Sequence, residues 1–101
     1  MSVVTEVSAD GHKLTISIKG RFDFAKHQEF RESYELLDKK PHSIVVDLKD
    51  SNYLDSSALG MLLLLRDHAG GDDSDVRLIN SSSDVRKILA ISNFDKLFDI
   101  A

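Results

Sequence analysis

Apolar residues recur along this chain with two spacings, one typical of β-strands and one typical of α-helices. Short stretches that alternate apolar and polar residues, or that are apolar throughout, predict strands. Longer stretches that repeat apolar residues every three or four positions predict amphipathic helices. Strands are predicted at 3–7, 14–18, 44–48 and 75–80, and helices at 24–37, from about 57 to 69, and from 84 onward.

These elements follow one another in the order β-β-α-β-α-β-α, which is typical of an α/β fold. Strands separated by helices pair in parallel, whereas the Asp10–Gly11 turn joins the first two strands into an antiparallel hairpin. We therefore expect a mixed four- to five-stranded sheet with helices packed on it, the fifth strand being a short one near the end of the chain.

The third predicted strand, Ile44 to Leu48, is nearly continuous and rich in β-branched residues. This composition is typical of a central strand that is covered on both faces. Asp47 interrupts the apolar run near its end, where we expect its carboxylate to be solvated or to bind a loop N–H group.

The second predicted helix is apolar nearly all round in its first two turns, from Ala58 to Leu65. A helix that packs one face on a sheet needs about three apolar positions per heptad, and this stretch has more. Two explanations remain open: a neighbouring helix buries the surplus side chains, or they form an exposed patch of the kind that marks partner sites. Gly60 costs helix stability, which suggests that its missing side chain permits close approach to the sheet or to a partner.

Polar residues that favour helix starts precede two of the predicted helices. Asp23 is predicted to cap the first helix, because its carboxylate can accept the unpaired N–H groups of the first turn. Asp55 and Ser56 offer the same role at the second helix. The adjacent serines, Ser56 and Ser57, also admit a second interpretation: one hydroxyl is exposed and receives a phosphoryl group, whose charge a helix N-terminus tolerates.

The composition is that of a single domain spanning residues 1–101, with 42% apolar and 30% charged residues. The net charge of −4 leaves no basic footprint for nucleic acid. The longest apolar run is too short to span a membrane, and the first residues lack a signal-peptide pattern. The absence of cysteine suits a reducing cytoplasm. We therefore expect a cytoplasmic domain that binds neither nucleic acid nor membranes.

No arrangement of residues typical of an enzyme stands out. The Gly-x-Ser-x-Gly and Gly-x-x-x-x-Gly-Lys motifs are absent. His68 follows Ser57 on the same helix at a distance of roughly 16 Å, from 1.5 Å per residue, and no two histidines have helical metal-ligand spacing. We therefore expect no catalytic activity, no metal and no cofactor. A serine that accepts phosphate needs only exposure to a kinase.

Two neighbouring segments carry a resemblance to a known family. Residues 45–48, Val-Val-Asp-Leu, followed by residues 54–60, Leu-Asp-Ser-Ser-Ala-Leu-Gly, resemble the signature of STAS domains, and more narrowly that of bacterial anti-sigma factor antagonists. Residues 18–23 and 94–98 are similar to family segments in the same order. In that family the second serine of the motif is phosphorylated, which implies phosphorylation of Ser57 and leaves Ser56 as the expected helix cap.

The resemblance implies a STAS fold and a regulator that switches partners to control sigma-factor-dependent transcription. The unphosphorylated protein would bind an anti-sigma factor, which can itself be the serine kinase. Phosphorylation of Ser57 would release it, and a phosphatase acting on phospho-Ser57 would reset the switch. The alternative is a STAS domain that serves as a structural subunit of a transporter or signalling assembly without phosphorylation. The residues expected to bind the partner are Asp23, Asp55, Ser56, Ser57, Ala58, Leu59, Met61 and Leu62.

Overall fold

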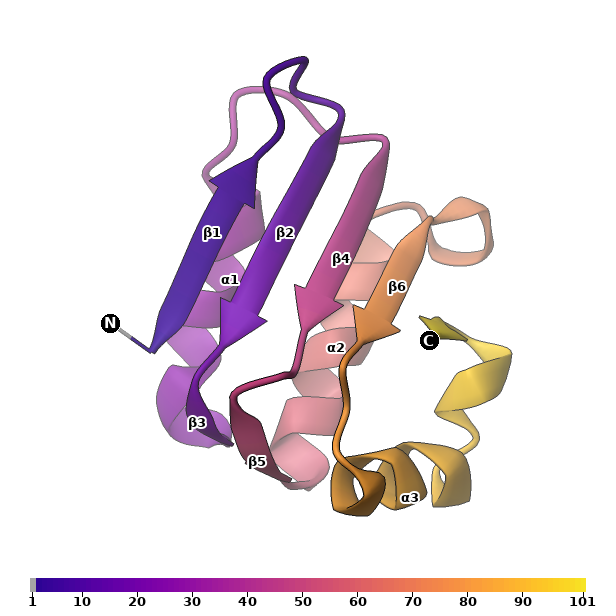
Figure 1. Ribbon diagram of the computed structural model, residues 1–101. Helices are drawn as coiled ribbons and strands as arrows, with labels where there is room; N and C mark the ends of the chain where they lie inside the picture. Colours follow the sequence, from indigo (N-terminus) through magenta and orange to yellow (C-terminus); the bar gives the residue numbers. More distant parts are fainter. Residues whose placement is uncertain (1) are drawn as a thin grey trace.

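The computed structural model describes residues 2–101 and has the α/β architecture that the hydrophobic pattern predicts (Figure 1). The strands are β1 Val3–Val7, β2 Lys13–Ile18, β3 Gly20–Phe22, β4 Ser43–Asp47, β5 Ser51–Leu54, β6 Val76–Ile79 and β7 Asp99–Ile100. The α-helices are α1 His27–Glu35, α2 Ser56–His68 and α3 Ser83–Ile91, and short 3₁₀ helices are η1 Phe24–Lys26, η2 Gly71–Asp73 and η3 Phe94–Lys96.

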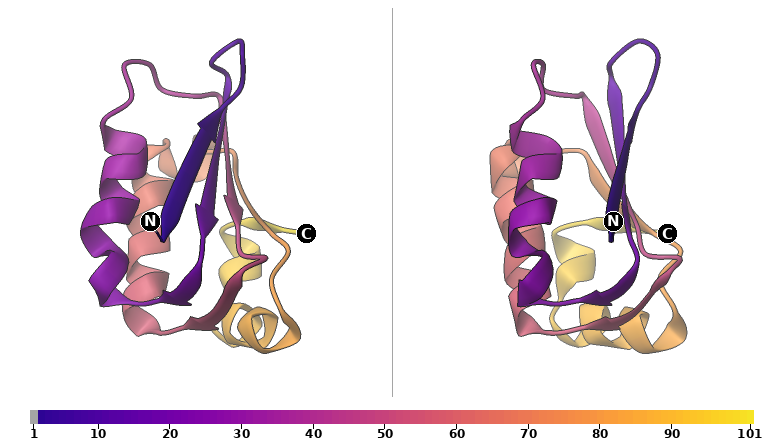
Figure 2. Two further views of the ribbon diagram at one scale, coloured as in Figure 1. Left: turned by 60° about the vertical axis from the view of Figure 1, so that its left-hand side comes forward. Right: turned by 90° about the vertical axis from the view of Figure 1, so that its left-hand side faces the viewer.

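The main sheet has five strands in the order β1-β2-β4-β6-β7. β1 pairs with β2 in the antiparallel sense, and the remaining neighbours pair in parallel. This confirms the predicted mixed sheet, with β7 as the short fifth strand. α1 and α2 pack side by side on one face of the sheet, and α3 lies across its lower end (Figures 1 and 2).

The hydrophobic core lies between the sheet and the helices. Leu14, Ile16 and Ile18 of β2 alternate inward and are fully buried, as their period-two pattern predicts. Phe30 and Tyr34, four residues apart and therefore on one side of α1, meet them from the helix side and are also buried. This packing holds α1 and α2 in fixed positions relative to the strand ends, where the candidate site lies.

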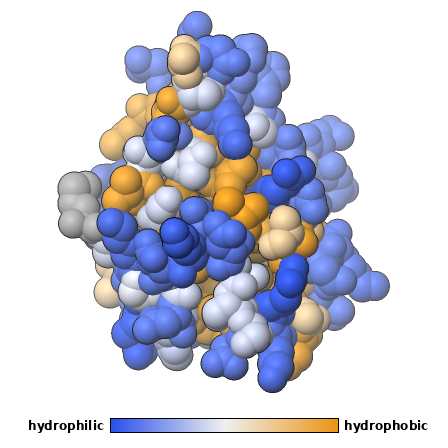
Figure 3. All heavy atoms as spheres, viewed as in Figure 1, coloured by the Kyte–Doolittle hydropathy of each residue, from blue (hydrophilic) through white to orange (hydrophobic). Residues whose placement is uncertain are grey.

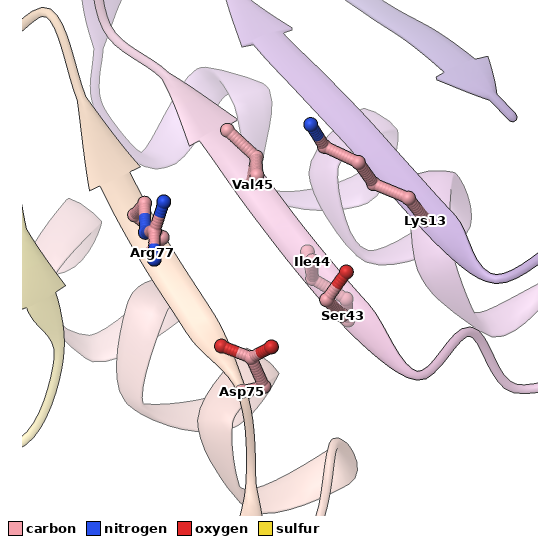
Figure 4. A pocket seen from close by; sticks show the side chains of 6 residues that line it. All are labelled: Lys13, Ser43, Ile44, Val45, Asp75 and Arg77. Atoms are coloured by element: carbon pink, nitrogen blue, oxygen red, sulfur yellow. The ribbon is translucent and has the colours of Figure 1, made fainter.

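The expectation that β4 is covered on both faces is wrong. Within residues 2–101 the helices α1 and α2 cover one face only, and the opposite face is turned to solvent (Figure 2). Val45 points to this open face and is nevertheless only 8% exposed, because Lys13 and Arg77 flank it from the neighbouring strands (Figure 4). Polar side chains accordingly surround the apolar atoms on this face (Figure 3).

Asp47, at the end of β4, binds as expected. Its carboxylate accepts a hydrogen bond of 2.9 Å from the backbone N–H of Lys49, and a second of 3.1 Å from the side-chain amide of Asn80. An acidic residue therefore interrupts the apolar run because its carboxylate binds the loops that follow β4 and β6.

A second, two-stranded sheet made of β3 and β5 was not predicted. The hairpin strand β2 ends at Ile18, and the φ of +78° at Gly20, the first residue of β3, lets the chain turn at once into this strand. β3 then pairs in parallel with β5, which directly precedes α2 (Figure 1). The two strands are too short for a hydrophobic period to be recognised, but they determine where the candidate site residues lie.

Candidate functional site

Asp23 and Asp55 hold equivalent places at the ends of the two short strands. Phe22 of β3 lies opposite Leu54 of β5, and both side chains are buried. The residue that follows each strand, Asp23 after β3 and Asp55 after β5, keeps an extended backbone. Its side chain therefore points to the side opposite that of the buried Phe22 and Leu54. The register therefore places Asp23 and Asp55 on the same side of the β3–β5 pair, at its carboxyl end.

Each of these carboxylates caps the helical segment that follows it. Asp23 accepts a hydrogen bond of 3.1 Å from the N–H of Ala25. This confirms that Asp23 is a helix cap, but the segment it caps is the 3₁₀ helix η1, which leads into α1. Asp55 accepts a hydrogen bond of 3.0 Å from the N–H of Ala58 and caps α2. The expectation that Ser56 caps α2 is wrong. Ser56 is already the first helical residue and its side chain is exposed, whereas the extended backbone of Asp55 carries its carboxylate to the third helical N–H.

Ser57 is bound by the same carboxylate. Its Oγ donates a hydrogen bond of 2.6 Å to Oδ1 of Asp55, and its side chain is half-buried rather than fully exposed. This hydrogen bond, with a smaller contribution from the N–H of Ala58, outweighs desolvation and holds the pKa of Asp55 below its usual value. Asp55 is therefore ionised at neutral pH, and it fixes the direction of the Ser57 hydroxyl.

Two cationic side chains, those of Arg21 in β3 and Lys26 in η1, lie near this end of the strand pair, and sequence reasoning did not identify them. The guanidinium carbon of Arg21 lies 4.0 Å from the ring centre of Tyr53, and Arg21 Nε lies 3.4 Å from Oδ2 of Asp23. The ammonium of Lys26 donates to the backbone carbonyl of Arg21. The contact with Tyr53 depends on the pairing of β3 with β5, so the sequence offered no signal for it.

The side chains of α2 divide between core and solvent. Ala58, Met61 and Leu62 are buried, so the prediction that they contact a partner is wrong: their place on the sheet-facing side makes them supports for the helix. Leu59 is half-buried and packs against the core. Leu63 and Leu64 are 41% and 56% exposed. Both earlier explanations therefore hold in part, because the core covers most of the surplus apolar residues and leaves these two leucines exposed.

Gly60 does not approach the sheet. A Cβ atom built on it meets no heavy atom within 4 Å, so the interpretation that its missing side chain lets the helix come close to the sheet is wrong. In a helix, Ser56, Gly60, Leu63 and Leu64 follow one another at spacings of three and four residues, which places them along one side. We call these four residues the α2 ridge; it runs from the exposed serine to the exposed leucines.

Two further features, metal-ligand clusters and membrane-spanning helices, are not found among residues 2–101. There is no group of three or more histidine, aspartate or glutamate side chains placed to hold a metal ion. None of the helices in this part of the chain is both long enough and apolar enough to cross a membrane.

The chain belongs to the STAS-domain family. The family model described as "Mlab, STAS domain" matches residues 5–99. A STAS-domain containing protein of Pseudomonas aeruginosa (strain UCBPP-PA14) is 59% identical over 101 residues, which cover the whole length of both chains.

Solved structures share the fold at low sequence identity. The anti-sigma factor antagonist SpoIIAA in its unphosphorylated form has a TM-score of 0.75 at 17% identity, covering 98% of this chain and 86% of that one. The phosphorylated form of this Bacillus protein has a TM-score of 0.74 at 18% identity, with 98% and 90% covered. A sulfate transporter family protein from Wolinella succinogenes has a TM-score of 0.76 at 12% identity, with 93% and 80% covered.

Proposed function

We propose that this chain is an anti-sigma factor antagonist whose binding is switched by phosphorylation of Ser57. The unmodified protein binds an anti-sigma factor and thereby frees a sigma factor for transcription. The phosphorylated protein releases the anti-sigma factor, and a phosphatase restores the binding form. In this function the chain is a binding protein and a kinase substrate, not an enzyme, and it works in the cytoplasm.

One observation carries the proposal: in a chain of the STAS family, the Ser57 hydroxyl is bound to Asp55 at the N-terminus of α2. A phosphoryl group there replaces the hydroxyl hydrogen and adds about −1.5 to −2 charges beside two carboxylates. The helix N-terminus favours an anion by about 0.3–1 kcal/mol, so the domain tolerates the group. A partner packed against it must bury that charge, which is costly unless the charge is paired.

The proposed partner surface combines this charge-sensitive site with the α2 ridge. The first turn of α2 contributes Ser56, Ser57 and the half-buried Leu59 to this surface, and Asp23 and Asp55 lie at its edge. The exposed leucines of the ridge supply the apolar area that a stable complex needs. Ala58, Met61 and Leu62 hold the helix in place from below. A charge added at Ser57 therefore lies at the end of an apolar contact surface.

The proposal is tested by affinity capture from the cells that make this protein. The baits are the unmodified protein and the same protein with phosphoserine installed at position 57 during translation, and bound proteins are quantified by mass spectrometry. We expect an anti-sigma factor on the unmodified bait and its depletion on the phosphorylated one. Phosphopeptide mapping of the protein purified from cells should find the modification on Ser57; modification confined to Ser56 or to residues 81–83 contradicts the assignment.

A second candidate function is that of a structural subunit in a transporter or signalling assembly. The observation in its favour is the shared fold of the sulfate transporter family protein. Such a subunit needs the fold and the α2 ridge but no phosphorylated serine. The same capture experiment distinguishes it, because both baits would then retain the same membrane or signalling proteins in equal amounts.

A further inference from the structure

The side of the β3–β5 pair that carries Asp23 and Asp55 also carries Arg21 and Tyr53. Arg21 lies opposite Tyr53 in the register of the pair. Side chains two residues apart on a strand share a side, so Arg21 precedes Asp23 and Tyr53 precedes Asp55 on one surface. The guanidinium of Arg21 already leans across to β5, because it lies 4.0 Å from the Tyr53 ring centre.

The present contacts of Arg21 leave its guanidinium free to move. Its side chain is 63% exposed, and its approach to Asp23 is a single contact of 3.4 Å between Nε and one carboxylate oxygen. Asp23 meanwhile uses its other oxygen, Oδ1, for the N–H of Ala25. Exposed ion pairs of this kind are weak, so a stronger anion nearby can take the guanidinium from Asp23.

We propose that Arg21 binds the phosphoryl group of phosphorylated Ser57. Its guanidinium then gives up its contacts with Asp23 and Tyr53. The inference rests on the phosphorylation of Ser57 proposed above and adds the residue that receives the phosphate. Phosphate oxygens match the planar fork of a guanidinium, which binds them with two parallel hydrogen bonds. Two residues along a strand span about 6.6 Å, so the guanidinium over Tyr53 has to move by about this distance to reach Asp55. The carboxylate of Asp55 holds the Ser57 oxygen 2.6 Å away.

The charges around Ser57 explain why a cation is needed there. A phosphoryl group on Ser57 lies beside the carboxylate of Asp55, on the side of the strand pair that also carries Asp23, and these like charges repel it. The N-terminus of α2 offsets part of this repulsion. Lys26 is the other nearby cation, but its ammonium is bound to the carbonyl of Arg21. Arg21 therefore has the side chain that is placed and free to pair with the phosphate.

The consequence for binding is that phosphorylation changes the surface at two places at once. Charge appears at the start of the α2 ridge, and the Tyr53 ring, now 38% exposed beneath the guanidinium, loses its cover. A partner that packs on the unmodified surface meets both changes.

The test uses protein with phosphoserine installed at position 57 during translation, so that no kinase is required. Phosphorus NMR follows the second ionisation of the phosphate through pH 4–8 in four proteins: the parent, Arg21→Gln, Lys26→Gln and Arg31→Gln. An adjacent cation lowers the pKa of an acidic group by about one unit or more, so Arg21→Gln should raise the phosphate pKa by about one unit. Lys26→Gln should raise it less.

Arg31→Gln is the matched control, because Arg31 belongs to α1, has a half-exposed side chain like that of Arg21, and pairs with Glu35 at 3.6 Å; it should leave the phosphate pKa unchanged. Equal values in the Arg21→Gln and Arg31→Gln proteins, or a larger change in Lys26→Gln than in Arg21→Gln, would overturn the proposal.

A second measurement needs no substitution and covers the case in which Arg21→Gln does not fold. Nitrogen-15 NMR of the arginine Nε–H groups should show the Arg21 resonance shifting when Ser57 carries phosphate, while that of Arg31 stays in place. An Arg21 resonance that does not shift overturns the proposal. Since the phosphate is installed directly, this failure is distinct from failure of the proposed function, which would appear as another modified serine or as unchanged partner capture.

Discussion

The hydroxyl of Ser57 donates a 2.6 Å hydrogen bond to the carboxylate of Asp55, the residue that caps the same helix. One carboxylate thus serves both the helix start and the serine. A chemical change at the Ser57 oxygen therefore alters the hydrogen bonding of the residue that caps α2. A substitution of Asp55 likewise removes the acceptor that orients the Ser57 hydroxyl.

Replacing Ser57 by alanine should raise the pKa of Asp55 toward its ordinary value of 3.8, because the largest cause of its lowered pKa is the hydrogen bond from Ser57. A carboxyl whose pKa is lower in the folded state stabilises the fold above its unfolded-state pKa, and this stabilisation is lost as the pH falls through the folded-state value. As the pH falls below about 4, the free energy of unfolding should therefore decrease less in the variant than in the parent. Carbon-13 NMR titration of the Asp55 carboxyl checks this; an unchanged pKa contradicts it.

Phosphorylation of Ser57 should leave the fold intact. The phosphate joins a helix N-terminus, which favours an anion, and Ser57 is not one of the buried core residues. Amide NMR spectra of the modified and unmodified protein should differ around residues 21–24 and 53–60 only. Shifts spread through β1, β2 and β6 would show that the phosphate disturbs the core instead of the surface.

Gly60→Ala should stabilise the unbound protein and weaken partner binding. A helical glycine costs about 0.5–1 kcal/mol relative to alanine, and the added methyl group meets nothing within 4 Å. Urea unfolding should therefore show a gain of this size. On the α2 ridge the same methyl group stands where the partner packs, so calorimetry should show weaker binding. Unchanged binding would mean that the partner does not lie over Gly60.

Leu64→Ser should weaken partner binding with little loss of stability, because Leu64 is 56% exposed. The matched control is Leu62→Ala, two residues away on the same helix but fully buried. Loss of a buried leucine side chain costs about 2–5 kcal/mol of folding free energy. Urea unfolding and calorimetry on both variants separate the two roles. A partner affinity that is insensitive to Leu64→Ser would exclude this part of the ridge from the interface.

The hydrophobic pattern was sufficient to predict the main sheet and the helices. The alternation of Leu14, Ile16 and Ile18 determines which face of β2 is buried, and the stripe of Phe30 and Tyr34 does the same for α1. Capping by Asp23 followed from local chemistry as well. These features depend on residues close together in the sequence, so their spacing alone carries the information.

Features that depend on distant residues could not be predicted in this way. The pairing of β3 with β5 places Arg21 over Tyr53 across more than thirty residues of sequence, and no local pattern reports it. The choice of Asp55 over Ser56 as the cap depends on where β5 ends. The burial of Met61 and Leu62 beside the exposure of Leu63 and Leu64 depends on how α2 is rotated against the sheet, which a helix that is apolar all round does not reveal.

The central claim is that charge at Ser57 controls binding of the anti-sigma factor. Calorimetric titration of the captured anti-sigma factor into four proteins tests it most directly: the parent, Ser57→Ala, Ser57→Asp and the protein carrying phosphoserine at position 57. Ser57→Ala adds no charge and should bind within about 1 kcal/mol of the parent, the net worth of one hydrogen bond. Ser57→Asp adds one charge and should bind more weakly, and phosphoserine, with about −1.5 to −2 charges, should bind most weakly. Equal affinity of all four proteins would contradict the account, because charge at Ser57 would then not be the switch.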